Sequence, residues 1–227
     1  MATIHFILQG KGGVGKSVVA ALLHQGLEAL GHEVKGYDTD SVNGTFAAYG
    51  AFNASRVEVV LPGGGISRQG MDELLNTLAD TPDGVHAVVD NGAASSTALA
   101  AFLAEYDMLT ALEDKGHCVY LHTVLVGGQG YDEAARHAAL LLSDFSGTPI
   151  IGWLNPCFGD VRVNAALSFF AFLAVPTATG IQGHCLARLY ARRQTFREGV
   201  RTAPICEKAH LWRYWSEFFS AFSKIPW

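Results

Sequence analysis

The sequence has few of the features that mark a secreted, zinc-binding or membrane-spanning protein. It contains four cysteines in 227 residues, without C-x-x-C spacing, at Cys118, Cys157, Cys185 and Cys206. This argues against a zinc site and indicates reduced thiols. No signal peptide precedes the first predicted strand, so we expect a cytoplasmic protein. The longest apolar run, 165–175 with Ser168 inside it, is too short to cross a bilayer.

Charge is also scarce. Charged residues make up 16% of the chain and the net charge is −5, which argues against a generally basic nucleic-acid binder. Hydrophobic residues make up 49%, which excludes a disordered chain. The length suits one α/β domain with a full core, and we expect residues 1–227 to form that single domain.

One stretch carries most of the chemical information. Residues 10–17 read GKGGVGKS and match the phosphate-loop template G-x-x-x-x-G-K-[ST]. A short apolar segment precedes the loop, and an apolar-periodic segment follows it, as the motif requires. Glycines let the backbone approach phosphates closely, Lys16 reaches the β- and γ-phosphates, and the Ser17 hydroxyl coordinates Mg²⁺. The sequence therefore predicts a site for a nucleotide and Mg²⁺.

Predicted strands and helices alternate along the chain. The strands are expected at 3–8, 33–37, 56–61, 85–89, 118–126 and 150–154, with a last one ending near Val175-Pro176. The helices are expected at 16–30, 71–78, 97–106, 131–142, 165–172, 186–193 and 207–224. This alternation predicts a doubly wound α/β fold, with a mostly parallel sheet and helices on both faces.

Polar residues follow several of these strands. Asp38 and Asp40 come after the second strand, Asp90 after the fourth, and Asn155-Pro156 after the sixth. Ligands of such sheets bind at the carboxyl ends of strands, where carboxylates can orient Mg²⁺ and its waters. The alternatives are local ones: turn aspartates, a helix N-cap at Asp90, and an Asn-Pro turn.

The second lysine of the loop, Lys11, is not required by the general template. KGGVGKS with two lysines resembles the deviant Walker A motif of the ParA and MinD ATPases, a family that includes the nitrogenase iron protein and arsenite-pump ATPases. The resemblance implies ATP and Mg²⁺ as ligands, hydrolysis, and a nucleotide-dependent homodimer.

The resemblance also assigns roles to single residues. Lys11 crosses the dimer interface and Asp40 positions the hydrolytic water, so that Lys11, Lys16 and Asp40 form the catalytic set. Ser17, Asp38 and Asp90 hold the metal, directly or through water. Residues 43–45 and 91–93 form two switch segments. The nucleotide is held by Gly10, Gly12, Gly13, Val14, Gly15, Lys16, Ser17, Val18, Asn155 and Pro156, with Asn155 on the base.

A narrower resemblance covers residues 1–156. The segments at 5–17, 38–43, 89–93, 122–124 and 153–156 are similar to those of TraL and StbC proteins, ParA-like ATPases of conjugative or mobilisable plasmids. This resemblance implies a role in plasmid transfer or maintenance, with a transfer or partition protein as the partner.

The remaining third of the chain leaves several interpretations open. The helix at 207–224 has an apolar stripe of Leu211, Trp215, Phe218 and Phe222, widened by Trp212 and Phe219, which suits packing on the domain, a partner surface or a membrane anchor. Five of ten arginines fall within 14 residues, at Arg188, Arg192, Arg193, Arg197 and Arg201. They are expected either to form a solvated or ion-paired surface or to contact DNA phosphates.

Two other functions also fit the phosphate loop. One is a small-molecule phosphotransferase, which Lys11 argues against. The other is a nucleotide-binding scaffold with little hydrolysis. The expected function is a ParA/MinD-like ATPase switch.

Overall fold

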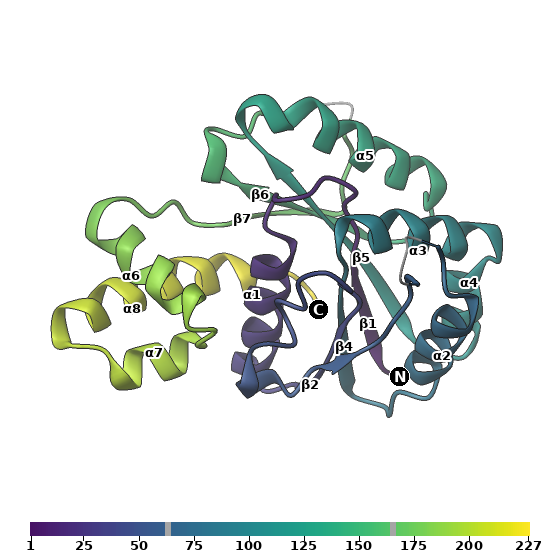
Figure 1. Ribbon diagram of the computed structural model, residues 1–227, viewed down its shortest axis with the longest axis horizontal. Helices are drawn as coiled ribbons and strands as arrows, with labels where there is room; N and C mark the ends of the chain where they lie inside the picture. Colours follow the sequence, from purple (N-terminus) through teal and green to yellow (C-terminus); the bar gives the residue numbers. More distant parts are fainter. Residues whose placement is uncertain (62–64, 164–166) are drawn as a thin grey trace.

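A seven-stranded sheet forms the centre of the molecule. The computed structural model describes residues 1–61, 65–163 and 167–227. The strand order is β3-β2-β4-β1-β5-β6-β7, and every paired neighbour is parallel (Figure 1). The strands are β1 (Thr3–Ile7), β2 (Glu33–Asp38), β3 (Ser55–Arg56), β4 (Val85–Asp90), β5 (Cys118–Val126), β6 (Ile150–Asn155) and β7 (Ala171–Ala174). This confirms the predicted doubly wound α/β fold.

Helices cover both faces of this sheet. They are α1 (Lys16–Ala29), α2 (Arg68–Ala79), α3 (Ala93–Glu105), α4 (Met108–Asp114), α5 (Tyr131–Asp144), α6 (Gly180–Ala191), α7 (Phe196–Thr202) and α8 (Ile205–Phe222). Residues alternate between faces along each strand. Ile7 and Trp153 therefore join α1 and α8 in one core, while Ile4 and Phe6 join α2, α3 and α4 in another. Figure 1 shows these groups of helices on opposite sides of the sheet.

The helix predicted at 165–172 is wrong. Residues 164–166 lie outside the described part, and Ala171–Ala174 form the edge strand β7, parallel to β6. Burial alternates along β7, with Leu173 buried and Phe172 exposed. The pairing of β7 with β6 follows this two-residue period. In a continuous apolar run the period cannot be recognised from the sequence, so strand and helix look alike.

Two further predictions need correction. Of the strand predicted at 56–61, Arg56 pairs with β2 within Ser55–Arg56, and Val60 makes an isolated antiparallel bridge to Ile66. Pro62 and a three-glycine turn at 63–65 are predicted to end this strand, and residues 62–64 lie outside the described part. The helix predicted from Thr97 begins at Ala93, and α4 was not anticipated; Asp107, with a φ of 51°, separates it from α3.

Helix α8 packs onto the sheet through α1 and β6. Its buried side chains are Leu211, Tyr214, Phe218 and Phe222. The Phe218 ring stacks on Trp153, and a Cβ on Gly26 of α1 would lie 2.6 Å from the Phe222 ring. The apolar stripe therefore serves packing. Trp212 does not belong to it, because 61% of its surface is exposed. Among the described residues, no helix is both long and apolar enough to cross a bilayer.

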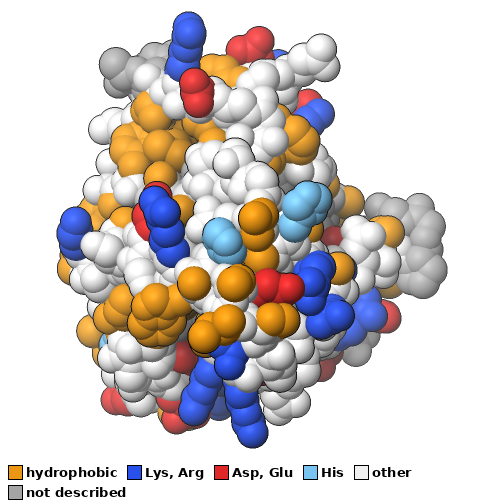
Figure 2. Space-filling model, turned by 90° about the vertical axis from the view of Figure 1, so that its left-hand side faces the viewer, with side chains coloured by type: hydrophobic (Ala, Val, Ile, Leu, Met, Phe, Trp, Pro, Cys, Tyr) orange, Lys and Arg blue, Asp and Glu red, His pale blue; other side chains and the backbone are white. Residues whose placement is uncertain are grey.

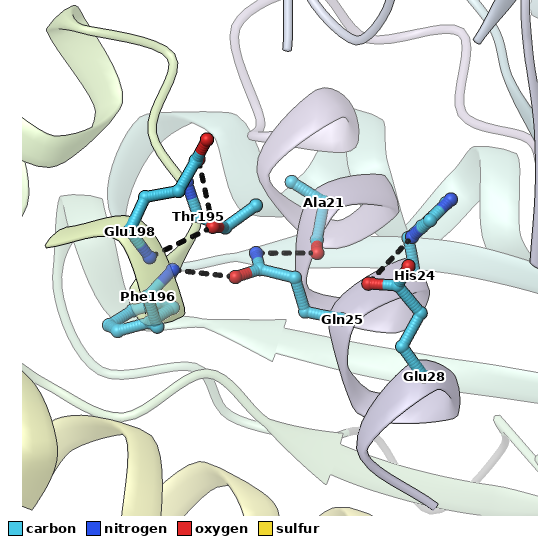
Figure 3. A network of polar contacts seen from close by, with 7 residues as sticks. All are labelled: Ala21, His24, Gln25, Glu28, Thr195, Phe196 and Glu198. Atoms are coloured by element: carbon cyan, nitrogen blue, oxygen red, sulfur yellow. Dashed lines mark hydrogen bonds and ion pairs between the residues drawn. The ribbon is translucent and has the colours of Figure 1, made fainter. Parts of the chain in front are cut away.

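A side-chain link joins α1 to the C-terminal helices (Figure 3). The buried Gln25 amide donates to the Ala21 carbonyl at 2.9 Å and accepts from the Phe196 amide at 2.7 Å. Beside it, Thr195 and Glu198 form a capping box that begins α7. The bend between α6 and α7 is made by Arg193, whose φ is 52°. The chain therefore bends where the helix expected at 186–193 ends.

Candidate nucleotide-binding site

The phosphate loop joins the end of β1 to the start of α1. Strand β1 lies between β4 and β5, so the loop is flanked by the ends of both strands. Gly13 and Gly15 have φ values of 75° and 97°, in the region that glycine favours. The Asn155 amide donates to the Val14 carbonyl at 2.9 Å, which ties the end of β6 to the loop.

Lys16 closes the loop from inside. Its side chain is mostly buried, and Nζ donates to the Lys11 carbonyl at 3.0 Å. Burial lowers the pKa of this ammonium group, while the nearby Asp90 and Asp40 carboxylates raise it. A buried cation surrounded by loop amides is suited to bind an anion, and the bond to one backbone carbonyl is readily exchanged for phosphate.

Asp90 is the most unusual polar group near the loop. It is fully buried at the end of β4, and neither carboxylate oxygen has a hydrogen-bond partner among the described residues. Burial raises its pKa to about 7, the Ser17 hydroxyl and Lys16 oppose this, and the charges of Asp38 and Asp40 add to it. An unpaired buried carboxylate beside a serine hydroxyl fits a magnesium ion, whose preferred ligands are oxygens.

The two other aspartates shape the loop that follows β2. The Asp38 oxygens accept from the Asp40 amide at 2.9 Å and from the Ala47 amide at 2.8 Å. Asp40 accepts from the Val42 and Asn43 amides at 3.0 and 3.1 Å. Asp38 is therefore the fixed base of this loop, and Asp40 lies at its inner side, where its carboxyl carbon would be 2.8 Å from a Cβ on Gly92.

A cavity of 480 Å³ brings many of the predicted residues together. It is lined by Gly12, Gly13, Gly15, Lys16, Ser17, Val18, Asp40, Ser41, Val42, Asn43, Thr45 and residues 91–95. Both predicted switch segments border it. Seven of the predicted site residues are not part of this lining and lie behind it or beside it: Gly10, Lys11, Val14, Asp38, Asp90, Asn155 and Pro156. Within the described residues, no group of three or more His, Cys, Asp or Glu side chains is placed to hold a metal without further ligands.

Three buried polar residues, Gln9, Thr39 and Asn91, hold the ends of these strands together, and this structural role was not predicted from the sequence. The Gln9 amide donates to the Val124 carbonyl at 2.9 Å and accepts from the Lys11 amide at 3.2 Å. Asn91 donates to the Ile7 carbonyl at 3.0 Å and accepts from the Thr39 hydroxyl at 2.6 Å. These bonds connect the ends of β1, β2, β4 and β5. Gln9, Thr39 and Asn91 lie within two residues of a strand's end, and this position is the signal that could have indicated them.

Lys11 and Asn155 make contacts within the chain. Lys11 Nζ pairs with the Glu133 carboxylate of α5 at 2.6 Å. The Asn155 amide bonds the loop, as described, and its oxygen accepts from the Cys157 amide at 3.3 Å, at the start of a short 3₁₀ turn, η3 (Pro156–Phe158). In this state Asn155 positions the loop, and its role at a base stays a prediction.

The five arginines lie away from this cavity, on α6 and α7 and in the bend between them. Arg188 pairs with Glu207 at 2.8 Å, and Arg193 donates to the Tyr190 carbonyl at 2.9 Å. Arg192, Arg197 and Arg201 are exposed. The ion-paired alternative therefore holds for Arg188, and three arginines present their charge to solvent.

Comparisons with known proteins agree with this geometry. Residues 5–116 match the model of the CobQ/CobB/MinD/ParA nucleotide binding domain. Two TraL proteins from Escherichia coli are 39% and 38% identical over 163 residues, which is 71% of this chain. The match spans 66% of each TraL protein, just under two thirds of its length.

Solved structures share the fold. A chain of the MinC:MinD cell division complex from Aquifex aeolicus superposes with a TM-score of 0.57 and 14% identity, over 96% of each chain. A putative plasmid partition protein from Borrelia burgdorferi bound to AMPPNP gives 0.53 and 15%, over 99% of this chain and 100% of that one. MinD from Pyrococcus horikoshii, complexed with Mg-ADP, gives 0.52 and 15%, over 96% and 95%. With its phosphate loop, parallel sheet and TraL-like sequence, this chain belongs to the ParA/MinD group of P-loop nucleotide-binding proteins.

Proposed function

We propose that this protein binds and hydrolyses Mg-ATP, and that ATP joins two copies into a dimer whose formation acts as a switch. The observation that carries the proposal is Asp90, a fully buried carboxylate with two unpartnered oxygens beside Ser17 and Lys16. A buried carboxyl without a hydrogen-bond partner lowers the stability of the free chain. A bound Mg²⁺ would provide it with a partner.

Each residue of the site then has its own role. Loop amides and Lys16 bind phosphates, and Ser17 and Asp90 hold the metal, with Asp38 nearby. Mg²⁺, when bound, neutralises phosphate charge. Asp40 lies on the cavity wall next to Gly92 and orients the attacking water. Lys11 reaches the partner's nucleotide after leaving Glu133. The cavity residues 41–43, 45 and 91–95 respond to the third phosphate.

The cellular role we propose is plasmid conjugative transfer or maintenance, in the cytoplasm, with a transfer or partition protein as partner. It is supported by the similarity to TraL proteins, and the four free cysteines suit a reducing compartment. Non-specific DNA is a second proposed partner, through the exposed Arg192, Arg197 and Arg201.

The deciding experiment is the molecular mass of the protein in solution with ATP and with ADP, for the wild type and two variants. Asp40→Ala should bind ATP and persist as a dimer, because water activation is lost while binding survives. Lys11→Ala should bind ATP, dimerise poorly and hydrolyse slowly. Identical behaviour of the two variants in sizing and turnover would show that the assigned roles are wrong.

The same assays separate the two alternatives. A phosphotransferase would consume ATP in proportion to a phosphorylated second substrate and would not need a dimer. A scaffold would bind ATP and dimerise, but its turnover would stay at the level of Asp40→Ala even with partner proteins or DNA present.

A further inference from the structure

A second cavity lies at the far end of α1, where α7 and α8 meet it. Its volume is 580 Å³, within the range of ligand pockets. It is lined by Gln25, Glu28, Ala29, Gly31, His32, Thr195, Phe196, Arg197, Val200, Trp212 and Trp215. The nucleotide-binding residues described above are absent from this lining. The Gln25 bond to the Phe196 amide, drawn in Figure 3, holds its inner wall together.

Aromatic rings form much of this cavity's wall. The ring centres of Phe196 and Trp215 are 5.2 Å apart, and Phe196 also stacks on Tyr214, so both rings are held in place. Trp212 also lines the cavity, yet 61% of its surface is exposed. An exposed tryptophan beside fixed rings provides a flat apolar surface on which another ring can stack.

The C-terminal segment that supplies α7 and α8 to this cavity differs sharply in charge from the rest of the chain. Residues 180–227 contain eight Lys or Arg and three Asp or Glu, a net charge of +5, whereas residues 1–179 contain eight and eighteen, a net charge of −10. Arg197 lines the cavity, and Arg201 follows one turn later on α7. Figure 2 looks onto this end of the molecule and shows basic side chains next to hydrophobic patches.

We propose that this cavity captures an unpaired base of a single-stranded nucleic acid. The base would stack on Trp212, and the strand's phosphates would contact Arg197 and Arg201. Stacking on aromatic rings combined with a positively charged surface is the usual chemistry of single-strand binding. Glu28 and His32 offer an acceptor and a second polar group to the edge of the base. A base inside a duplex has both faces covered, so it cannot enter.

Charge favours this occupant over an apolar segment of another protein. An apolar anchor would fill the aromatic wall equally well, but it would gain nothing from Arg197 and Arg201 or from the net charge of +5 that residues 180–227 carry in an acidic protein. The inference does not rest on ATP binding or hydrolysis, because none of the cavity's lining residues belongs to the phosphate loop.

The test measures binding of a fluorescein-labelled oligothymidine of about 20 nucleotides, in low salt without ATP, by anisotropy. Trp212→Leu should weaken binding about 5- to 160-fold, because stacking contributes about 1 to 3 kcal/mol per base. Trp212→Phe is the matched control: it keeps a ring that can stack and should retain most of the affinity. Both variants should fold, since Trp212 is mostly exposed.

Two further arms examine charge and base. Arg197→Gln should reduce the salt slope of log affinity by about 0.7, while Arg136→Gln, an equal charge change on α5, should leave it unchanged. An abasic oligonucleotide and a duplex of the same sequence should both bind more weakly than oligothymidine, and oligouridine would distinguish RNA from DNA.

Three outcomes would show that the proposal is wrong. The duplex and the single strand could bind with equal affinity, Trp212→Leu and Trp212→Phe could bind oligothymidine equally well, or neither oligothymidine nor oligouridine could bind at all. Lys16→Ala should bind oligothymidine normally, which keeps this test separate from that of the ATPase.

Discussion

At the residue scale, Gly15 is constrained from two directions. Its φ of 97° is unfavourable for any residue with a side chain, and a Cβ there would lie 2.6 Å from the Asn155 amide nitrogen. Gly12, three residues earlier in the same loop, has neither constraint, because no described atom lies within 4 Å of its Cβ position. Substituting each of these two glycines in turn therefore distinguishes the effect of backbone strain in the loop from an effect on phosphate binding.

Gly15→Ala should destabilise the nucleotide-free protein by roughly 1 to 3 kcal/mol, because the backbone strain and the contact with Asn155 act together. The melting temperature should fall by about 2 to 4 °C for each kcal/mol. Gly12→Ala is the control and should melt like the wild type. Equal melting temperatures for both variants would contradict this view of the loop.

Lys16→Ala should abolish measurable ATP binding. It removes the buried cation that faces the phosphates, at a cost of about 2 to 4 kcal/mol, or roughly 30- to 900-fold in affinity. Titration calorimetry with ATP is the measurement. Lys35→Ala removes an exposed lysine of β2 and should bind normally. Unchanged affinity in Lys16→Ala would mean that the loop does not bind the nucleotide phosphates.

At the scale of elements, α5 is connected to the phosphate loop twice. The Gln9 amide donates to the Ala134 carbonyl at 3.3 Å, and the Glu133 carboxylate pairs with Lys11 at 2.6 Å. The second contact holds the side chain that the ParA/MinD resemblance assigns to the dimer interface. Helix α5 therefore keeps Lys11 within its own chain in the structure described.

Glu133→Gln should favour the ATP-bound dimer, because Lys11 no longer has to leave an ion pair. Both side chains are more than one third exposed, so the pair contributes at most about 1 kcal/mol, and the dimer affinity should rise by about fivefold or less. Sedimentation with ATP measures it, with Asp132→Asn as a control that removes a neighbouring charge. A weaker dimer in Glu133→Gln would instead assign Glu133 to the interface.

At the scale of the whole molecule, a row of three histidines crosses the neighbouring strands β5, β1 and β4, and Trp153 of β6 extends it. Trp153 donates to His122 Nδ1 at 3.0 Å, so His122 carries its proton on Nε2 and donates to His5 Nδ1 at 3.1 Å. His5 then donates from Nε2 to His86 Nδ1 at 3.0 Å. Burial lowers the pKa of His122 to about 3 and of His86 to about 4, with His32 adding to the effect on His86. Burial also lowers the pKa of His5, and the charges of the other histidines add to this, so all three rings are neutral in the folded protein.

This row predicts acid sensitivity. A histidine that stays neutral when folded, but is protonated below about pH 6.5 when unfolded, makes stability fall by up to about 1.4 kcal/mol per pH unit as the pH decreases. The contribution of such a histidine to stability is fully present above its unfolded pKa and is lost as the pH falls toward its folded pKa. Asp90, with a folded pKa of about 7, acts in the opposite direction over the same range. Three histidines outweigh one aspartate.

Urea unfolding from about pH 6.5 to pH 5 measures this slope. His86→Gln keeps an acceptor for His5 and should make the slope shallower by up to about 1.4 kcal/mol per pH unit. His184→Gln makes the same change at an exposed position and should match the wild type. A wild-type stability that does not change with pH, or equal slopes in both variants, would contradict the neutral state assigned to the row.

The sequence alone determined the phosphate loop, the parallel sheet and the candidates Asp40, Asp90 and Asn155. These depend on local patterns: glycine spacing, residues that end apolar strands, and alternation of strand with helix. His5 and His122 fall within two of the predicted strands, and both are fully buried. Such features need only neighbours along the chain.

Tertiary structure decided the rest. Lys11 meets Glu133, Gln25 meets Phe196, and Trp212 lies at a cavity instead of in the core, because helices separated by up to 171 residues pack side by side. The apolar run after residue 166 became an edge strand because β6 offered unpaired backbone groups. Local pattern specifies which elements form, but partners across the sheet and between helices are chosen by packing, which no short window of sequence contains.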